Sequence, residues 1–211
     1  MKSLASIGLS GMVLAGFAAI TTLAIGSTYL ITKEQIEFEV RLAEARQLLE
    51  IFPSDSHDNE LVDDTFSIAA DTPLLGLREN LRGYRARKGN QIIGIILPIT
   101  ARDGYSGDIR ALVGIRRDNS VAGVRIVSHR ETPGLGDKVD LRKSNWVLDF
   151  NDRSLLNPPI SAWTVTKDGG IFDQFTGATI TPRAVVVATR KALEYAALHS
   201  EELFKEKANP L

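Results

Sequence analysis

The feature that most constrains this chain is a long N-terminal stretch without any charged residue. Residues 3–32 consist of apolar and small side chains with a few hydroxyls. A helix needs ~20 mostly apolar residues to cross a bilayer, so this stretch is long enough. A cleaved secretion signal has a shorter apolar core of ~7–15 residues, although Ala24-Ile25-Gly26 offers a small-x-small cleavage pattern. We therefore predict an uncleaved single-pass transmembrane helix, with cleavage as the alternative.

The charges around the span do not decide its orientation. Lys2 and the terminal amine precede it, while Lys33, Arg41 and Arg46 follow it, so the positive-inside rule gives no answer. The span also contains small residues that would allow close packing against other membrane helices, unless they merely make it weakly hydrophobic. These are Gly8, Gly11, Ala15, Gly16, Ala18 and Ala19.

Beyond the span, the pattern predicts an α+β domain with a mostly antiparallel, twisted sheet and flanking helices. Apolar, β-branched runs predict strands, and a helix closes the chain. The expected strands are 92–100, which Pro98 should end, bulge or place at an edge, then 109–115, 121–127 and 162–166, and the closing helix is 182–207. Residues 33–52 predict a helix that Pro53 ends. The expected division is an anchor (1–32), a helical stalk and loop (33–60) and a folded domain (61–211).

Composition excludes several kinds of chemistry. The chain has no cysteine, which excludes disulfides, thiol catalysis and cysteine-ligated metal clusters. The histidines, His57, His129 and His199, lie far apart without metal-ligand spacing, and His57 and the pair Asp63-Asp64 read as surface residues. The net charge of −1 gives no electrostatic reason to expect nucleic-acid binding. Redox chemistry would therefore require an organic cofactor or partner subunits.

Residues 173–183 predict a small-residue loop that leads directly into a helix. Thr181-Pro182 is a helix-start signal, with Thr181 as N-cap and Pro182 at the first helical position. A helix N-terminus presents unpaired N–H groups and suits a phosphate. Taken alone, the stretch is also explained as a tight loop with threonine caps, and Thr176, Thr179 and Thr181 are all near the helix start.

Asp173-x-x-Thr176-Gly177-Ala178-Thr179 resembles the flavinylation motif of the FMN-binding domain family. The resemblance implies that Thr179 carries FMN through a phosphoester bond, installed by a separate flavin transferase. Thr176, Gly177 and Ala178 would then lie beside the cofactor.

A second stretch, residues 129–138, contains Glu131-Thr132-Pro133-Gly134-Leu135-Gly136. Its proline and glycines predict an unusual turn, which alone would be structural. It resembles the loop that the same family places against the flavin, which implies cofactor contacts for Glu131, Thr132, Leu135 and Gly136. The family also has a lysine near the flavin at a place comparable to Lys167, although this residue equally fits a solvated turn.

Within the family, both motifs look more like those of Rnf-type (Rsx-type) electron-transport complexes than those of sodium-translocating NADH:quinone reductases. The resemblance implies a bacterial inner-membrane subunit with a periplasmic C-terminal domain. It would carry electrons on covalent FMN, beside other subunits of a complex that couples electron transfer to ion translocation. No catalytic side chain and no metal are expected. A stand-alone flavin reductase and a non-redox binding module with the same fold are the alternatives.

Overall fold

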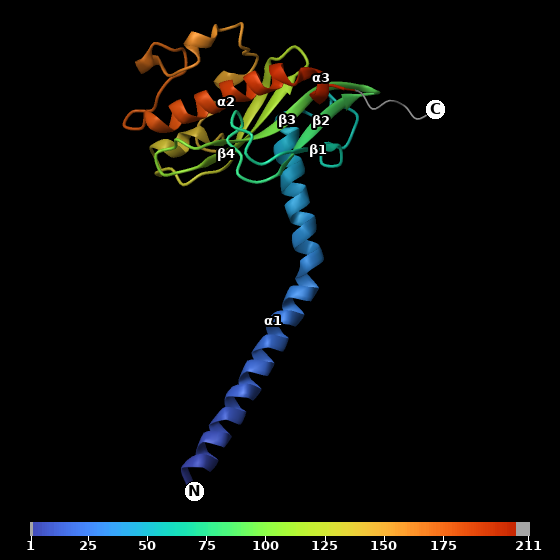
Figure 1. The fold of residues 1–211 in the computed structure, drawn as a ribbon, viewed down its shortest axis with the longest axis vertical. Coiled ribbons are helices and arrows are strands. Elements are labelled where there is room, and N and C mark those ends of the chain that lie inside the picture. Colours follow the sequence, from blue (N-terminus) through green and yellow to red (C-terminus); the bar gives the residue numbers. More distant parts are fainter. Residues whose placement is uncertain (1, 206–211) are drawn as a thin grey trace. The chain divides into compact units, whose positions relative to one another are not determined.

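The computed structural model describes residues 2–205, with side chains from residue 8 onward. It divides into two compact units, Met1–Glu44 and Ala45–Leu211. Helix α1 (Lys2–Leu49) runs through the first unit and ends in the second (Figure 1). The predicted N-terminal helix is confirmed, and it ends three residues before the expected Phe52. The compact second unit begins at Ala45 and so includes the last residues of α1.

The helix of the first unit has the composition of a membrane span. It contains an 18-residue window with a mean hydropathy of 1.8, within a segment long enough to cross a bilayer. The Thr21, Thr28 and Thr32 hydroxyls donate to the carbonyls four residues earlier, at 2.7, 2.9 and 2.9 Å. These bonds keep the hydroxyls paired inside the helix, as a hydrocarbon environment requires.

The second unit is built on a five-stranded antiparallel sheet in the order β1-β2-β3-β4-β5. The strands are β1 (Thr65–Ile68), β2 (Leu81–Lys88), β3 (Gln91–Ala101), β4 (Ile109–Arg116) and β5 (Val121–Ser128) (Figure 1). The three strands predicted between 92 and 127 are confirmed, and so is the α+β class. Strands β1 and β2 were not predicted, because β1 is short and β2 carries four basic residues, which hide its apolar alternation.

Pro98 lies inside β3, at a point where the proline disturbs no pairing. The ladder between β2 and β3 extends only from Gln91 to Ile96 on β3. Pro98 pairs with Leu112 of β4, and its other side faces no β2 residue. The strand is therefore locally an edge at the proline, where a missing N–H costs no ladder hydrogen bond.

The two faces of the sheet are covered by different parts of the chain. Helix α2 (Ile180–Leu198) packs on β3 and β4 over one face, and the short α3 (Ser200–Leu203) follows it. The opposite face meets the end of α1 and the residues after it, where Ile51 and Phe52 are buried. A Cβ on Gly114 would lie 2.1 Å from Ile51 Cγ2, and one on Gly94 would lie 2.2 Å from Phe52 Cζ. These glycines let both side chains reach the sheet.

The predicted strand 162–166 is wrong. The region between β5 and α2 instead contains four short 3₁₀ turns and two isolated bridges, Val165 with Phe172 and Phe175 with Ala178. The turns are η1 (Gly136–Val139), η2 (Asn145–Phe150), η3 (Ile160–Ala162) and η4 (Thr166–Asp168). The aromatic side chains here pack on one another: Phe150 stacks on Phe172 at 4.6 Å and Trp146 contacts Phe150 edge-on at 5.3 Å. Aromatic packing orders this segment together with a few backbone hydrogen bonds, among them Thr166 N–H to Phe172 O at 2.8 Å. Trp146 and Phe150 both belong to the hydrophobic core.

The closing helix is shorter than the predicted 182–207. It begins at Ile180, and α2 ends at Leu198 with His199 as C-cap before α3. Residues 206 and 207 lie outside the described residues.

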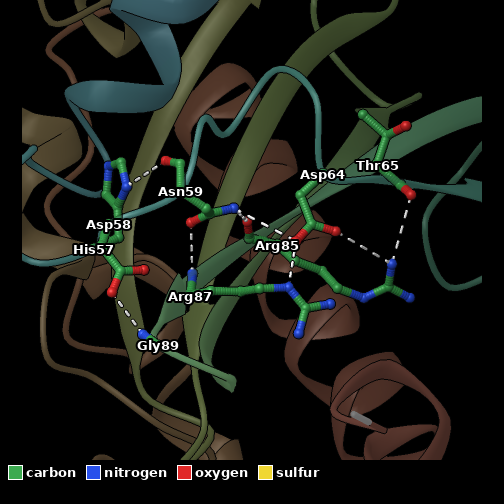
Figure 2. Close-up of polar contacts among 8 residues, drawn as sticks. All are labelled: His57, Asp58, Asn59, Asp64, Thr65, Arg85, Arg87 and Gly89. Carbon is green, nitrogen blue, oxygen red and sulfur yellow. Dashed lines mark hydrogen bonds and ion pairs between the residues drawn. The ribbon is translucent and has the colours of Figure 1, made fainter. Parts of the chain in front are cut away.

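Residues 57–65 are fastened to β2 by a polar network (Figure 2). The Asn59 side chain accepts a hydrogen bond from Arg87 N at 2.7 Å and donates one to Arg85 O at 2.9 Å. Asp64 forms ion pairs with Arg87 and, at 3.9 Å, with Arg85. His57 Nδ1 lies 2.9 Å from Asn59 O, so this nitrogen donates. Asp64 and His57 are half-buried structural residues, which corrects the expectation that both lie free at the surface.

Candidate functional site

The two sequence motifs meet at one cavity of about 380 Å³. Its volume lies within the ~300–1,000 Å³ typical of small-molecule sites. Three segments form its walls: the turn after β3, the loop after β5 and the start of α2. The lining residues are Tyr105, Glu131, Thr132, Leu135, Gly136, Gly177, Ala178, Thr179, Ile180 and Thr181. Seven of the nine residues nominated from the sequence therefore lie together.

Thr179 occupies the N-cap position of α2 and is half-buried. Its carbonyl accepts the Arg183 N–H at 3.3 Å, but its side chain makes no capping hydrogen bond. The first N–H groups of a helix have no intrahelical acceptor and present a positive dipole end. The Thr179 hydroxyl is thus uncommitted to the helix and stands beside a cavity at a place suited to phosphate.

Thr181 was expected to cap this helix, and that expectation is wrong. The helix begins at Ile180, and the Thr181 hydroxyl donates instead to Glu131 Oε2 at 2.5 Å. A carboxylate accepts a stronger hydrogen bond than a neutral group does, and the Thr181 side chain is fully buried against it. The tertiary contact therefore takes the hydroxyl that the local signal assigned to the cap.

Glu131 joins all three walls of the cavity. Its side chain is only 4% exposed, and Oε1 accepts the Ser106 N–H at 2.9 Å while Oε2 accepts from Thr181. A Cβ on Gly136 would lie 2.7 Å from Thr181 Oγ1 and 2.8 Å from Glu131 Oε2, so only glycine fits there. We call this set, Ser106, Glu131, Gly136 and Thr181, the Glu131 brace. Neither Ser106 nor the role of Thr181 could be recognised from local sequence.

The loop that leads into α2 is held in place by Trp146. Trp146 Nε1 donates to Asp173 O at 2.8 Å, and the Trp146 ring meets Phe175 edge-on at 5.2 Å. Gly177 has φ +81°, and Ala178 N donates to Phe175 O at 3.0 Å, which closes a tight turn. The backbone before Thr179 is therefore fixed, and Gly177 supplies the conformation that other residues rarely adopt.

Comparison with known proteins decides the family. Residues 1–51 match the family model of the RnfG N-terminal region, and residues 104–194, which contain every wall of the cavity, match that of the FMN-binding domain. The G subunit of an ion-translocating oxidoreductase complex from Vibrio cholerae serotype O1 (strain M66-2) is 43% identical over 203 residues, 96% of each chain. The corresponding protein of Pseudoalteromonas atlantica (strain T6c), which has the same name, is 44% identical over 92% of this chain and 90% of its own. The chain belongs to the RnfG family.

The FMN-binding domain of this RnfG family member has the features that FMN needs. The cavity has the size for a small organic cofactor, and an uncommitted hydroxyl stands at a helix N-terminus for the phosphate. Glu131 is the one charged residue in the described lining, and both its oxygens are bonded within the protein. The remaining surface of the lining is apolar, small or hydroxylic, which suits a flat aromatic ring.

Two nominated residues are not part of the cavity wall. Thr176 is exposed in the turn before Gly177, and Lys167 is exposed in η4.

The neighbour of Lys167, Asp168, binds Arg183 of α2 through two hydrogen bonds of 2.5 and 2.9 Å. These bonds, together with the Arg183 and Lys167 charges, lower the pKa of the Asp168 carboxyl. Gln174 ties the same turn to the loop by accepting from Thr166 Oγ1 at 2.6 Å and Lys167 N at 3.1 Å.

Proposed function

We propose that this RnfG family member is the electron-carrier subunit of a bacterial membrane complex in which electron transfer drives ion translocation. We further propose that it carries FMN bound to Thr179 through a phosphoester. The observation that carries the proposal is the position of Thr179, whose hydroxyl is not used for capping and lines a cavity at the N-terminus of α2. Family membership supports the redox role and the partnership with other subunits.

In this proposal, FMN supplies reversible electron transfer, and the protein supplies attachment, orientation and electrostatics. Thr179 holds the phosphate, and the first N–H groups of α2 offset its charge. Gly177 and Ala178 leave the backbone open to the cofactor, while Thr132, Leu135 and Gly136 form the facing wall. Glu131 holds these walls together through its hydrogen bonds from Ser106 and Thr181. No side chain of the cavity is assigned a bond-breaking role in catalysis.

A covalent bond would retain the flavin on the periplasmic side, where we propose that the flavin domain lies. We place the anchor in residues 1–32 of the inner membrane, the connecting helix and loop in 33–60, and the flavin domain, 61–211, on the periplasmic side. Cytoplasmic FMN could not replace a cofactor lost there, so attachment by a flavin transferase would secure it. Lys167 would act from outside the cavity wall, through its charge, on the flavin.

The attachment is tested by mass spectrometry of the full-length protein, expressed in membranes together with a flavin transferase. We expect the peptide that contains Thr179 to carry the mass of FMN minus water, and Thr179→Ala to abolish it. Thr176→Ala is the matched control, because it removes a nearby hydroxyl outside the cavity wall and should leave the mass in place. The same added mass on the Thr179→Ala protein would contradict the assignment. Flavin fluorescence that disappears from the band on a denaturing gel would contradict covalent attachment.

A further inference from the structure

Tyr105 is an unusually exposed aromatic residue at the cavity. Its side chain is 70% exposed, and it lines the cavity together with Leu135 and Ile180, which are 41% and 44% exposed. These large apolar side chains come from three separate segments: the turn after β3, the loop after β5 and the first residue of α2. Apolar side chains that gather at one hollow mark a binding surface, whereas single exposed ones need no explanation.

The backbone that presents Tyr105 is fixed although its ring is exposed. The next residue, Ser106, donates its N–H to the buried Glu131 carboxylate at 2.9 Å. The preceding residue, Gly104, is so tightly enclosed that a Cβ would lie 2.2 Å from Gly107 O and 3.0 Å from Glu131 Oε1. The turn therefore cannot shift freely, and the Glu131 brace fixes the Tyr105 backbone relative to α2.

We propose that Tyr105 is a cofactor-contacting residue whose ring packs against the isoalloxazine ring of the FMN on Thr179. This inference rests on the proposed function. Tyr105 lies on a different wall from the attachment residue, so it can contact a part of the cofactor beyond the phosphate. The described lining offers the flavin ring no unpaired charge, and aromatic pairs prefer offset or edge contacts that the exposed Tyr105 ring is free to make.

The experiment uses the full-length, flavinylated protein in detergent and compares Tyr105→Ala with Tyr105→Phe. Leu156→Ala is the control, because Leu156 is 92% exposed and lies outside the cavity. The readouts are the flavin fluorescence anisotropy, which reports ring mobility, and the quenching constant for iodide, which reports ring exposure. Because Tyr105 is largely exposed, its truncation leaves the core intact.

We expect Tyr105→Ala to lower the ratio of packed to released ring roughly 2- to 10-fold, the effect of one aromatic contact. Anisotropy should fall and iodide quenching should rise, whereas Tyr105→Phe and Leu156→Ala should match the wild type. A Tyr105→Ala protein that matches the wild type would overturn the inference, as would a Tyr105→Phe protein that behaves like Tyr105→Ala.

Mass spectrometry of the same samples separates this inference from the proposed function. If the Thr179 peptide carries FMN but Tyr105→Ala changes neither the anisotropy nor the iodide quenching of the flavin, the inference alone fails. A wild-type protein without attached flavin contradicts the proposed function, and the Tyr105 contact with it. A Tyr105→Ala protein that acquires no flavin while Tyr105→Phe does supports a contact made by the ring.

Discussion

Thr181 Oγ1 donates a hydrogen bond of 2.5 Å to Glu131 Oε2, across 50 residues of chain, and both side chains are buried. The bond brings a carboxylate to the first turn of α2, where the helix dipole favours negative charge. It also removes Thr181 from capping and leaves Thr179 as the N-cap with an uncommitted hydroxyl. Because Thr181 binds Glu131, the Thr179 hydroxyl stays available to carry the proposed flavin.

Glu131→Ala should destabilise the domain, because the Ser106 N–H and the buried Thr181 O–H lose their acceptor. Hydrogen bonds to charged groups contribute ~1.5–3 kcal/mol each, so we expect the free energy of unfolding to fall by about 3 kcal/mol or more. Glu131→Gln keeps one acceptor oxygen and should lose less. Urea denaturation of the purified protein measures the change. Glu201→Ala, at an exposed position of α3, is the control, and an equally small change in both alanine variants would rule out the brace.

Gly136→Ala should disrupt the same brace sterically. The added Cβ would lie 2.7 Å from Thr181 Oγ1 and 2.8 Å from Glu131 Oε2, the two oxygen atoms that share a hydrogen bond. Overpacking of this kind typically costs ~1–3 kcal/mol of stability. It should also push the cavity walls apart, which should slow flavin attachment. Gly123→Ala is the control, because its nearest neighbours would lie at 3.5 Å. Thermal unfolding and the flavin content compare the two variants, and equal values would show that the brace tolerates a methyl group.

Asp140 gives the domain a predictable dependence on acid. The side-chain hydrogen bonds from Arg142 are the main cause that lowers the pKa of Asp140, and the Arg142 N–H and charge add to it. The folded pKa therefore lies below the unfolded value of ~3.9, so the stabilisation is present above that pH and is lost as pH falls through the folded pKa. Arg142→Ala should raise the pKa toward ~3.9 and reduce the acid dependence of unfolding.

NMR titration of the Asp140 carboxyl checks the shift directly. Arg82→Ala is the control for lost positive charge, since Arg82 is exposed on β2 and makes no described contact with Asp140. An Asp140 that titrates at or above the ordinary value in the wild type would contradict the assignment.

The orientation in the membrane can be tested because the chain has no cysteine. Ser200→Cys places a single thiol at an exposed position of α3. If the domain is periplasmic, a membrane-impermeant maleimide should label this cysteine in intact cells. Ser3→Cys, at the N-terminal end of the span, should be labelled only after the inner membrane is opened. The reverse pattern would place the domain in the cytoplasm.

Local composition was sufficient to predict several parts of the fold. Thirty residues without charge can form little other than a span-like helix, and β-branched runs between short polar turns produced β3, β4 and β5 as expected. The two loop motifs also lie together in the structure, since residues of both line one cavity. In each case, the determining interactions lie within a few residues of one another.

Other features depend on residues that are distant in the chain and meet only in the folded domain. The basic strand β2 forms because β3 pairs with it and Asp64 and Asn59 satisfy its arginines and backbone. Residues 162–166 lie outside the sheet because aromatic packing orders them instead. Thr181 binds a carboxylate 50 positions away, and Tyr105 reaches the cavity only because that carboxylate holds its turn. No local pattern encodes these contacts, because they exist only when the sheet has brought three loops to one place.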